Sequence, residues 1–119
     1  MKTNNVIVDK SFAFAVWTVH LYKHLTETKH EYVISKQILR SGTSIGANIK
    51  EAIRGQSKDD FANKLNISLK EASETEYWLD LLVATDYITK EEYESIHNDC
   101  LELIKLLTAI IKSSRKEGK

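Results

Sequence analysis

Residues 89–111 read TKEEYESIHNDCLELIKLLTAII, and this stretch decides the fold class of the chain. Thr89 followed by Glu92 forms a capping box, in which hydroxyl and carboxylate satisfy backbone N–H groups that the first helical turn leaves unpaired. At 100° per residue the apolar side chains that follow fall on one stripe, namely Tyr93, Ile96, Cys100, Leu103, Leu107 and Ile110. The pattern predicts an amphipathic helix over residues 90–114 with one face in a core.

The preceding sequence predicts three more helices of the same kind. They cover residues 10–28 with Asp9 or Ser11 as cap, residues 36–54 ended by Gly55, and residues 58–85 capped by Ser57. The connections are short, so successive helices are expected to be antiparallel neighbours. We therefore expect an all-α protein, an antiparallel up-down-up-down four-helix bundle, with one domain over residues 1–119 and an ordered core over about 9–115.

The composition excludes several other classes. The 119 residues contain no proline and 4 glycines, too few for a turn-rich β sandwich, and the lone Cys100 excludes a disulfide framework. No apolar run is long enough to span a membrane, and residues 1–8 lack a signal-peptide core. Lys and Arg total 17 and Asp and Glu total 17, so net charge favours no partner. We expect a cytoplasmic protein without membrane contact.

The first predicted helix has two opposed apolar faces. One carries Phe12, Ala15, Val16 and Val19, and the other carries Phe14, Trp17, Leu21 and Leu25. The third helix has a smaller second surface with Ile67, Trp78 and Leu81. Because a bundle covers one face of each helix, we expect self-association through Phe14, Trp17 and Leu21 or through Ile67 and Trp78. The alternative is a tilted first helix that covers both stripes within the monomer.

The second predicted helix carries two polar rows. The first row is a basic strip formed by Lys36, Arg40, Lys50 and Arg54. It is either a solvated face or a surface that follows the phosphates of a nucleic acid. In the second case the cations of the C-terminal tail would contribute too, namely Lys112, Arg115, Lys116 and Lys119. The other row, formed by Gln37, Ser41, Ser44, Asn48 and Glu51, predicts a hydrogen-bonded seam within the bundle or between subunits.

Two features of this helix concern its neighbours. Gly42 and Gly46 indicate that another backbone passes close by. Arg40 is expected to pair with carboxylates of the third helix, where Glu71, Glu74 and Glu76 are available.

Candidate catalytic and metal-binding residues are few. Two Glu-x-x-His strings, residues 27–30 and 94–97, resemble the ligand pattern of metal-binding bundles. Their direction argues against a shared metal, since Glu94 and His97 point off the core stripe and His30 falls in a predicted loop. His20 and His24 lack a third ligand, and Cys100 is expected to be a buried hydrophobe. We expect no enzyme, no metal and no cofactor.

Residues 37–52, QILRSGTSIGANIKEA, resemble the pattern Q-x-x-R-x-x-x-S-I-x-x-N-I-x-E of the 23S rRNA intervening-sequence proteins, small bacterial four-helix bundles. Residues 60–79 are similar to the third helix of that family, and Trp17 matches the tryptophan typical of its first helix. The resemblance covers residues 9–115. It implies a homopentamer without enzymatic activity. It also implies structural or interface roles for the family-motif positions Gln37, Arg40, Ser44, Asn48, Glu51 and Glu74.

The resemblance leaves two functions open. The related accessory protein of diversity-generating retroelements is a basic pentamer that binds nucleic acid and a reverse transcriptase. By this likeness we expect a homo-oligomer that binds RNA or DNA through the basic strip. This chain is neutral, so the alternative stays open that it is an adaptor for a larger protein and binds no nucleic acid.

Overall fold

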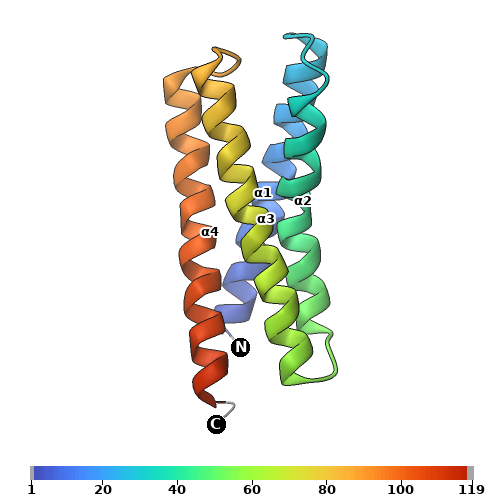
Figure 1. The fold of residues 1–119 in the computed structure, drawn as a ribbon, viewed down its shortest axis with the longest axis vertical. Helices are drawn as coiled ribbons and strands as arrows, with labels where there is room; N and C mark the ends of the chain where they lie inside the picture. Colours follow the sequence, from blue (N-terminus) through green and yellow to red (C-terminus); the bar gives the residue numbers. More distant parts are fainter. Residues whose placement is uncertain (1, 118–119) are drawn as a thin grey trace.

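The computed structural model describes the backbone of residues 2–117 and the side chains of residues 6–115. Within this range the chain forms four helices, α1 (Lys2–Glu27), α2 (Ile34–Ile53), α3 (Lys58–Ala84) and α4 (Lys90–Glu117). Successive helices run in opposite directions and lie side by side (Figure 1). The predicted all-α, up-down-up-down four-helix bundle is confirmed.

The helix starts follow the local sequence, with two corrections. Ser57 Oγ accepts a hydrogen bond of 3.0 Å from Asp60 N, and Thr89 and Glu92 form the reciprocal capping box at 2.8 and 3.1 Å. The expected cap of the first helix at Asp9 or Ser11 is wrong, because α1 begins at Lys2 and both residues lie inside it. The Ser11 hydroxyl instead donates to the Val8 carbonyl, 3.1 Å away within the same helix.

The start of α2 is capped by a residue that the sequence analysis did not identify. The buried carboxylate of Glu31 accepts hydrogen bonds from the backbone N–H groups of Val33, Ile34 and Ser35 at 3.1, 2.9 and 2.6 Å. These are three of the donors that a helix start leaves unpaired. The helix therefore begins at Ile34, just before the predicted start after Ser35.

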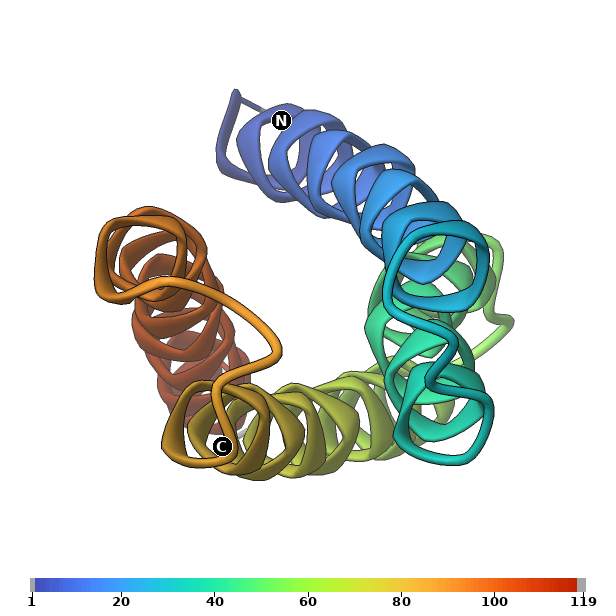
Figure 2. The same ribbon diagram turned by 90° about the horizontal axis from the view of Figure 1, so that it is seen from above.

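The core contains side chains from all four helices, as the single-stripe patterns predicted. Its largest fully buried members include Ile7, Leu25, Ile38, Ile45, Leu65, Leu79, Ile96 and Leu107. Packing is closest between α2 and its two neighbours, and of the helix pairs that are in contact, α1 and α4 touch the least. Figure 2 shows the resulting arrangement, in which α2 lies between α1 and α3 and the helix array is open between α1 and α4.

The two predicted glycines of α2 lie where α1 packs most closely. A Cβ on Gly46 would lie 3.4 Å from the Ser11 carbonyl oxygen, and a Cβ on Gly42 would lie 2.7 Å from Thr18 Cγ2. The prediction that another helix passes close to these glycines is confirmed. This close approach fixes the position of α1 along the axis of α2, with Ser11 beside Gly46 and Thr18 beside Gly42.

Candidate functional site

The outward side of α1 carries an apolar stripe. We define the α1 outer face as Phe12, Val16 and Val19, whose exposed fractions are 69%, 42% and 37%. The opposite side of the helix faces the core and also contains two buried hydroxyl residues, Ser11 and Thr18. Both apolar stripes of this helix thus exist as the sequence indicated, and one remains uncovered.

The identity of the uncovered stripe corrects the sequence analysis. Phe14 and Leu21, expected at an oligomer interface, are 4% and 6% exposed and belong to the core. Trp17 is half-buried and packs against the core edge. The helical repeat alone predicts two equivalent apolar stripes on α1. Which stripe faces the core depends on the close packing of α1 against Gly42 and Gly46 of α2.

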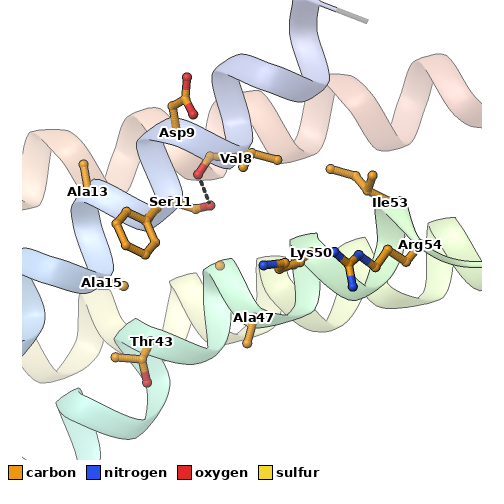
Figure 3. Close-up of a pocket in the computed structure, with 12 residues that line it drawn as sticks. Val8, Asp9, Ser11, Ala13, Ala15, Thr43, Ala47, Lys50, Ile53 and Arg54 are labelled. Carbon is orange, nitrogen blue, oxygen red and sulfur yellow. Dashed lines mark hydrogen bonds between the residues drawn. The ribbon is translucent and has the colours of Figure 1, made fainter.

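A groove of about 750 Å³ runs along the outer side of α1 and α2. Its lining includes Phe12 of the α1 outer face and the exposed Ile53 of α2. Lys50 and Arg54 lie on the α2 side of this groove, while Val8 and Ala15 come from α1 (Figure 3). The groove is therefore largely apolar, with the cations Lys50 and Arg54 on its α2 side and the acidic Asp9 on its α1 side.

Two large apolar side chains of α3 are exposed. Ile67 is 43% exposed and Tyr77 is 59% exposed, and the exposed Lys70 and Ser73 lie between them in the helix. Trp78, the other residue expected at an interface here, is half-buried, and its indole N–H donates to Glu74 Oε2 at 2.9 Å. Of the two residues predicted for this interface, Ile67 is thus exposed and Trp78 is half-buried.

The four residues of the basic strip have different surroundings. Arg40 Nη1 lies 3.3 Å from Glu71 Oε1, and Arg40 Nη2 pairs with Glu74. The prediction that Arg40 is paired with the third helix is confirmed, and its charge is compensated. Lys36, Lys50 and Arg54 are exposed, with no ion pair among the side chains of residues 6–115. Of the tail cations, Lys112 and Arg115 are exposed, whereas the side chains of Lys116 and Lys119 lie outside the described range.

The polar row of α2 contributes contacts inside the bundle. Ser41 is buried and its hydroxyl accepts a hydrogen bond of 2.8 Å from Thr75 of α3. Glu51 pairs with Lys64 of α3 at 2.9 Å. Ser44 and Asn48 bond to backbone carbonyls one turn earlier, at 2.6 and 2.8 Å, and Gln37 is exposed. The sequence left open whether this row forms a hydrogen-bonded seam within the bundle or between subunits. The contacts of Ser41 and Glu51 with α3 form a seam within the bundle.

Polar groups also join α3 to α4, a pairing that the sequence analysis missed. His97 Nε2 lies 2.8 Å from Glu76 Oε2, and the ring of Tyr93 stacks on His97 at 4.8 Å between centroids. Tyr93 OH donates to Asp80 at 2.5 Å, and this hydrogen bond raises the pKa of Tyr93 to about 12. The sequence did contain a signal for this pairing. Glu76 and Asp80 are four residues apart on α3, and Tyr93 and His97 are four residues apart on α4, so each pair lies on one side of its helix.

The candidate catalytic residues are held in structural contacts. Cys100 is fully buried, as predicted, and burial raises the pKa of its thiol to about 12. His30 bonds to Tyr32, away from His97, while Glu94 is exposed. No group of three or more His, Cys, Asp or Glu side chains within the described part of the chain is placed to hold a metal ion.

Among the described residues, none of the helices combines the length and apolar character needed to cross a bilayer.

Comparison with known proteins places this bundle in a family. Residues 3–109 match the family model described as 23S rRNA-intervening sequence protein. A solved structure of a protein of unknown function from the S23 ribosomal protein family of Bacteroides thetaiotaomicron is 64% identical in sequence. The match has a TM-score of 0.92 and covers 92% of this chain and 98% of that chain. Curated protein sequences give no match. Since the family model covers nearly the whole chain, the protein belongs to the 23S rRNA-intervening sequence protein family.

Proposed function

We propose that this protein is a non-catalytic helical bundle that acts as a homo-oligomer. The observation that carries the proposal is the α1 outer face, where Phe12 is 69% exposed beside the exposed Val16 and Val19. Contiguous apolar side chains on a helix surface cost free energy in water, and burying them against another protein surface removes that cost. The pentamer that the family resemblance implies is the assembly we propose.

The absence of catalysis is part of the same proposal. The single thiol is buried with a raised pKa, so it is a poor nucleophile at neutral pH. His97 is engaged by Glu76 and stacked on Tyr93. We place the assembly in the cytoplasm, where a lone thiol stays reduced.

The test compares two exposed aromatic positions by light scattering at micromolar protein concentration. Wild type is expected to be an oligomer, and Phe12→Glu is expected to be a folded monomer because position 12 lies outside the core. Tyr32→Glu, at a position 54% exposed on the α1–α2 connection, is the matched control and should leave the oligomer intact. A monomeric wild type would overturn the proposal.

A second candidate function is weak, sequence-tolerant binding of RNA or DNA. It is favoured by Lys36, Lys50 and Arg54, which lie exposed along α2 without an ion pair among the described side chains. Assembly would repeat these cations and raise avidity without new contacts. Arg40 contributes less than the sequence suggested, because Glu71 and Glu74 compensate its charge.

The test is a gel shift with RNA and DNA at about 50 mM salt, where phosphate contacts bind most tightly. The triple variant Lys36→Glu, Lys50→Glu, Arg54→Glu should lose the shift, provided that its oligomer is intact. The control variant Lys23→Glu, Lys90→Glu, Lys105→Glu changes net charge equally at exposed sites off the strip. No shift with wild type would contradict nucleic-acid binding and leave the protein adaptor as the function.

A further inference from the structure

We propose that the groove between α1 and α2 binds a medium-chain fatty acid, with the alkyl tail along the groove and the carboxylate at Lys50 and Arg54. The groove volume of about 750 Å³ is in the range of small-molecule sites. On α2 its lining extends from Thr43 to Arg54, a helix length of about 16 Å, which suits a chain of medium length. The inference goes beyond the proposed self-association, because a single copy carries the whole groove.

The walls and floor of the groove are suited to an alkyl chain. Phe12 and Ile53 are large apolar side chains of the lining, and both are exposed. Ala15, Gly46 and Ala47 are small and leave room between the two helices. Burying methylene groups against such a surface removes apolar area from water, and this is the main source of affinity for a fatty-acid tail.

The hydrogen bonds of the lining distinguish an alkyl chain from more polar occupants. The Ser11 hydroxyl donates to the Val8 carbonyl at 3.1 Å. The Thr43 hydroxyl donates to the Leu39 carbonyl at 2.7 Å, so neither hydroxyl proton is free for a ligand. Backbone groups of a helix are bonded within it. A nucleobase or an extended peptide in the groove would therefore leave donors and acceptors unpaired, which costs free energy, whereas an alkyl chain has none.

Two cations place the carboxylate end of the ligand. Lys50 and Arg54 are exposed one helical turn apart on α2, and neither forms an ion pair among the described side chains. Both also line an adjacent polar pocket of about 540 Å³, together with Gln56 and Lys64. They thus lie where apolar lining gives way to polar lining. A carboxylate at this point stays close to water and accepts charge-assisted hydrogen bonds from both cations.

Asp9 is the acidic residue of the lining and belongs to α1. Its side chain points away from α2 (Figure 3), and among the described side chains it has no ion pair with Lys50 or Arg54. The lining therefore carries a net positive charge, which lies on the α2 side. An anionic head group is favoured there over a neutral or a cationic one.

The test is calorimetric titration with three ligands that share one alkyl chain, namely decanoate, decanol and decyltrimethylammonium. Decanoate should bind about three- to tenfold more tightly than decanol, as expected for two exposed charge pairs. The cationic ligand should bind most weakly. Equal affinities for decanoate and decanol would overturn the proposed carboxylate site. Binding to phosphatidylglycerol vesicles without binding of decanoate would show a membrane surface in its place and also reject the proposal.

Charge variants test where the carboxylate lies. The double variant Lys50→Gln, Arg54→Gln should bind decanoate no more tightly than decanol, while its affinity for decanol stays at the wild-type value. The control Lys23→Gln, Lys36→Gln removes the same charge at exposed positions that do not line the groove, and it should bind both ligands as wild type does. Equal losses in the two double variants would contradict a specific contact with Lys50 and Arg54.

A second variant tests where the tail lies. Ala47→Trp places a large side chain in the groove from an exposed position outside the core. It should lower the affinity for decanoate and for decanol at least about tenfold, because fewer methylene groups are buried. Ala109→Trp, at an exposed position on α4, is the matched control. Circular dichroism checks that both variants fold, and wild-type affinity in folded Ala47→Trp would reject the groove.

One consequence rests on the proposed function. Phe12 belongs both to this groove and to the α1 outer face, so a fatty acid and a neighbouring copy compete for it. Decanoate should therefore shift the oligomer toward smaller species in light scattering. A monomeric wild type that binds decanoate rejects self-association and leaves the fatty-acid site standing. An oligomer that binds no decanoate, even after dilution to separate subunits, rejects the site alone.

Discussion

At the scale of single residues, Gly42 and Gly46 of α2 have different reasons to lack a side chain. A Cβ on Gly42 would lie 2.7 Å from both Cγ2 and Oγ1 of Thr18, a buried β-branched residue with little freedom to move. A Cβ on Gly46 would make an ordinary contact at 3.4 Å with Ser11. Alanine substitution at the two glycines therefore compares a position where a Cβ would clash with a position where it would fit.

We expect Gly42→Ala to lower the free energy of unfolding by about 1–3 kcal/mol through overpacking. Gly46→Ala should be neutral or should raise it by up to about 1 kcal/mol, because alanine is the better helix former. Chemical denaturation of both variants measures the difference. Thr18→Ala should rescue Gly42→Ala, and equal losses at the two glycines would show that close packing is not the cause.

Arg40 is the residue whose partner was correctly predicted. Its guanidinium bridges Glu71 and Glu74, and Glu74 also accepts the Trp78 indole N–H, so the group joins α2 to α3. Because half of the Arg40 side chain is exposed, we expect Arg40→Ala to cost only about 1 kcal/mol. Thermal unfolding should show this loss, and it should shrink at high salt. Unchanged stability would mean that the pairing contributes nothing.

At the scale of the helix, the starts of α2, α3 and α4 are all capped by side chains, and one cap is sensitive to pH. In α4 the hydrogen bond from Thr89 N lowers the pKa of Glu92 below its usual 4.5. A lowered folded-state pKa stabilises the protein above the unfolded pKa, and this contribution is lost as the pH falls through the folded value.

We expect Glu92→Gln to cost about 0.3–1 kcal/mol at pH 7, because the carboxylate also interacts with the helix dipole. The cost should shrink as the pH falls below 4.5 and through the lowered folded-state pKa, because wild-type Glu92 then takes up a proton and resembles glutamine. Urea denaturation over a series of pH values checks this, with Glu91→Gln as a control in the same turn. A cost that is independent of pH would contradict the capping role of the charge.

At the scale of the whole molecule, assembly couples to folding. A ligand or partner that binds only the folded state raises its stability by mass action, and for an oligomer the partner is the protein itself. The melting temperature of wild type should therefore rise with protein concentration. Phe12→Glu should abolish this dependence while keeping the helical signal in circular dichroism. A melting temperature independent of concentration in wild type would argue against a stable oligomer.

Much of this architecture could be predicted from local patterns. The capping residues Ser57 and Thr89, the single stripes of α2 and α4, and the buried position of Cys100 all depend on contacts within a few residues or on the helical repeat. The start of α1 at Lys2 was not predicted, because the cap-type residues Asp9 and Ser11 indicated a later start and in fact lie inside the helix. Nor was the Glu31 cap, because it comes from a residue outside the usual capping position.

The candidate site shows the same division. By itself the sequence determined that α1 carries two opposed apolar stripes, that α2 carries a basic strip, and that Arg40 needs carboxylate partners. Only the tertiary structure decided that Phe14 and Leu21 are buried while Phe12 is exposed. Only the structure, too, showed that Glu71 and Glu74 compensate the charge of Arg40, whereas Lys50 and Arg54 line a groove. The physical reason is that periodicity fixes the angle between two faces of a helix but not its rotation in the bundle. That rotation is set by the close approach of Ser11 and Thr18 to the two glycines of a neighbouring helix.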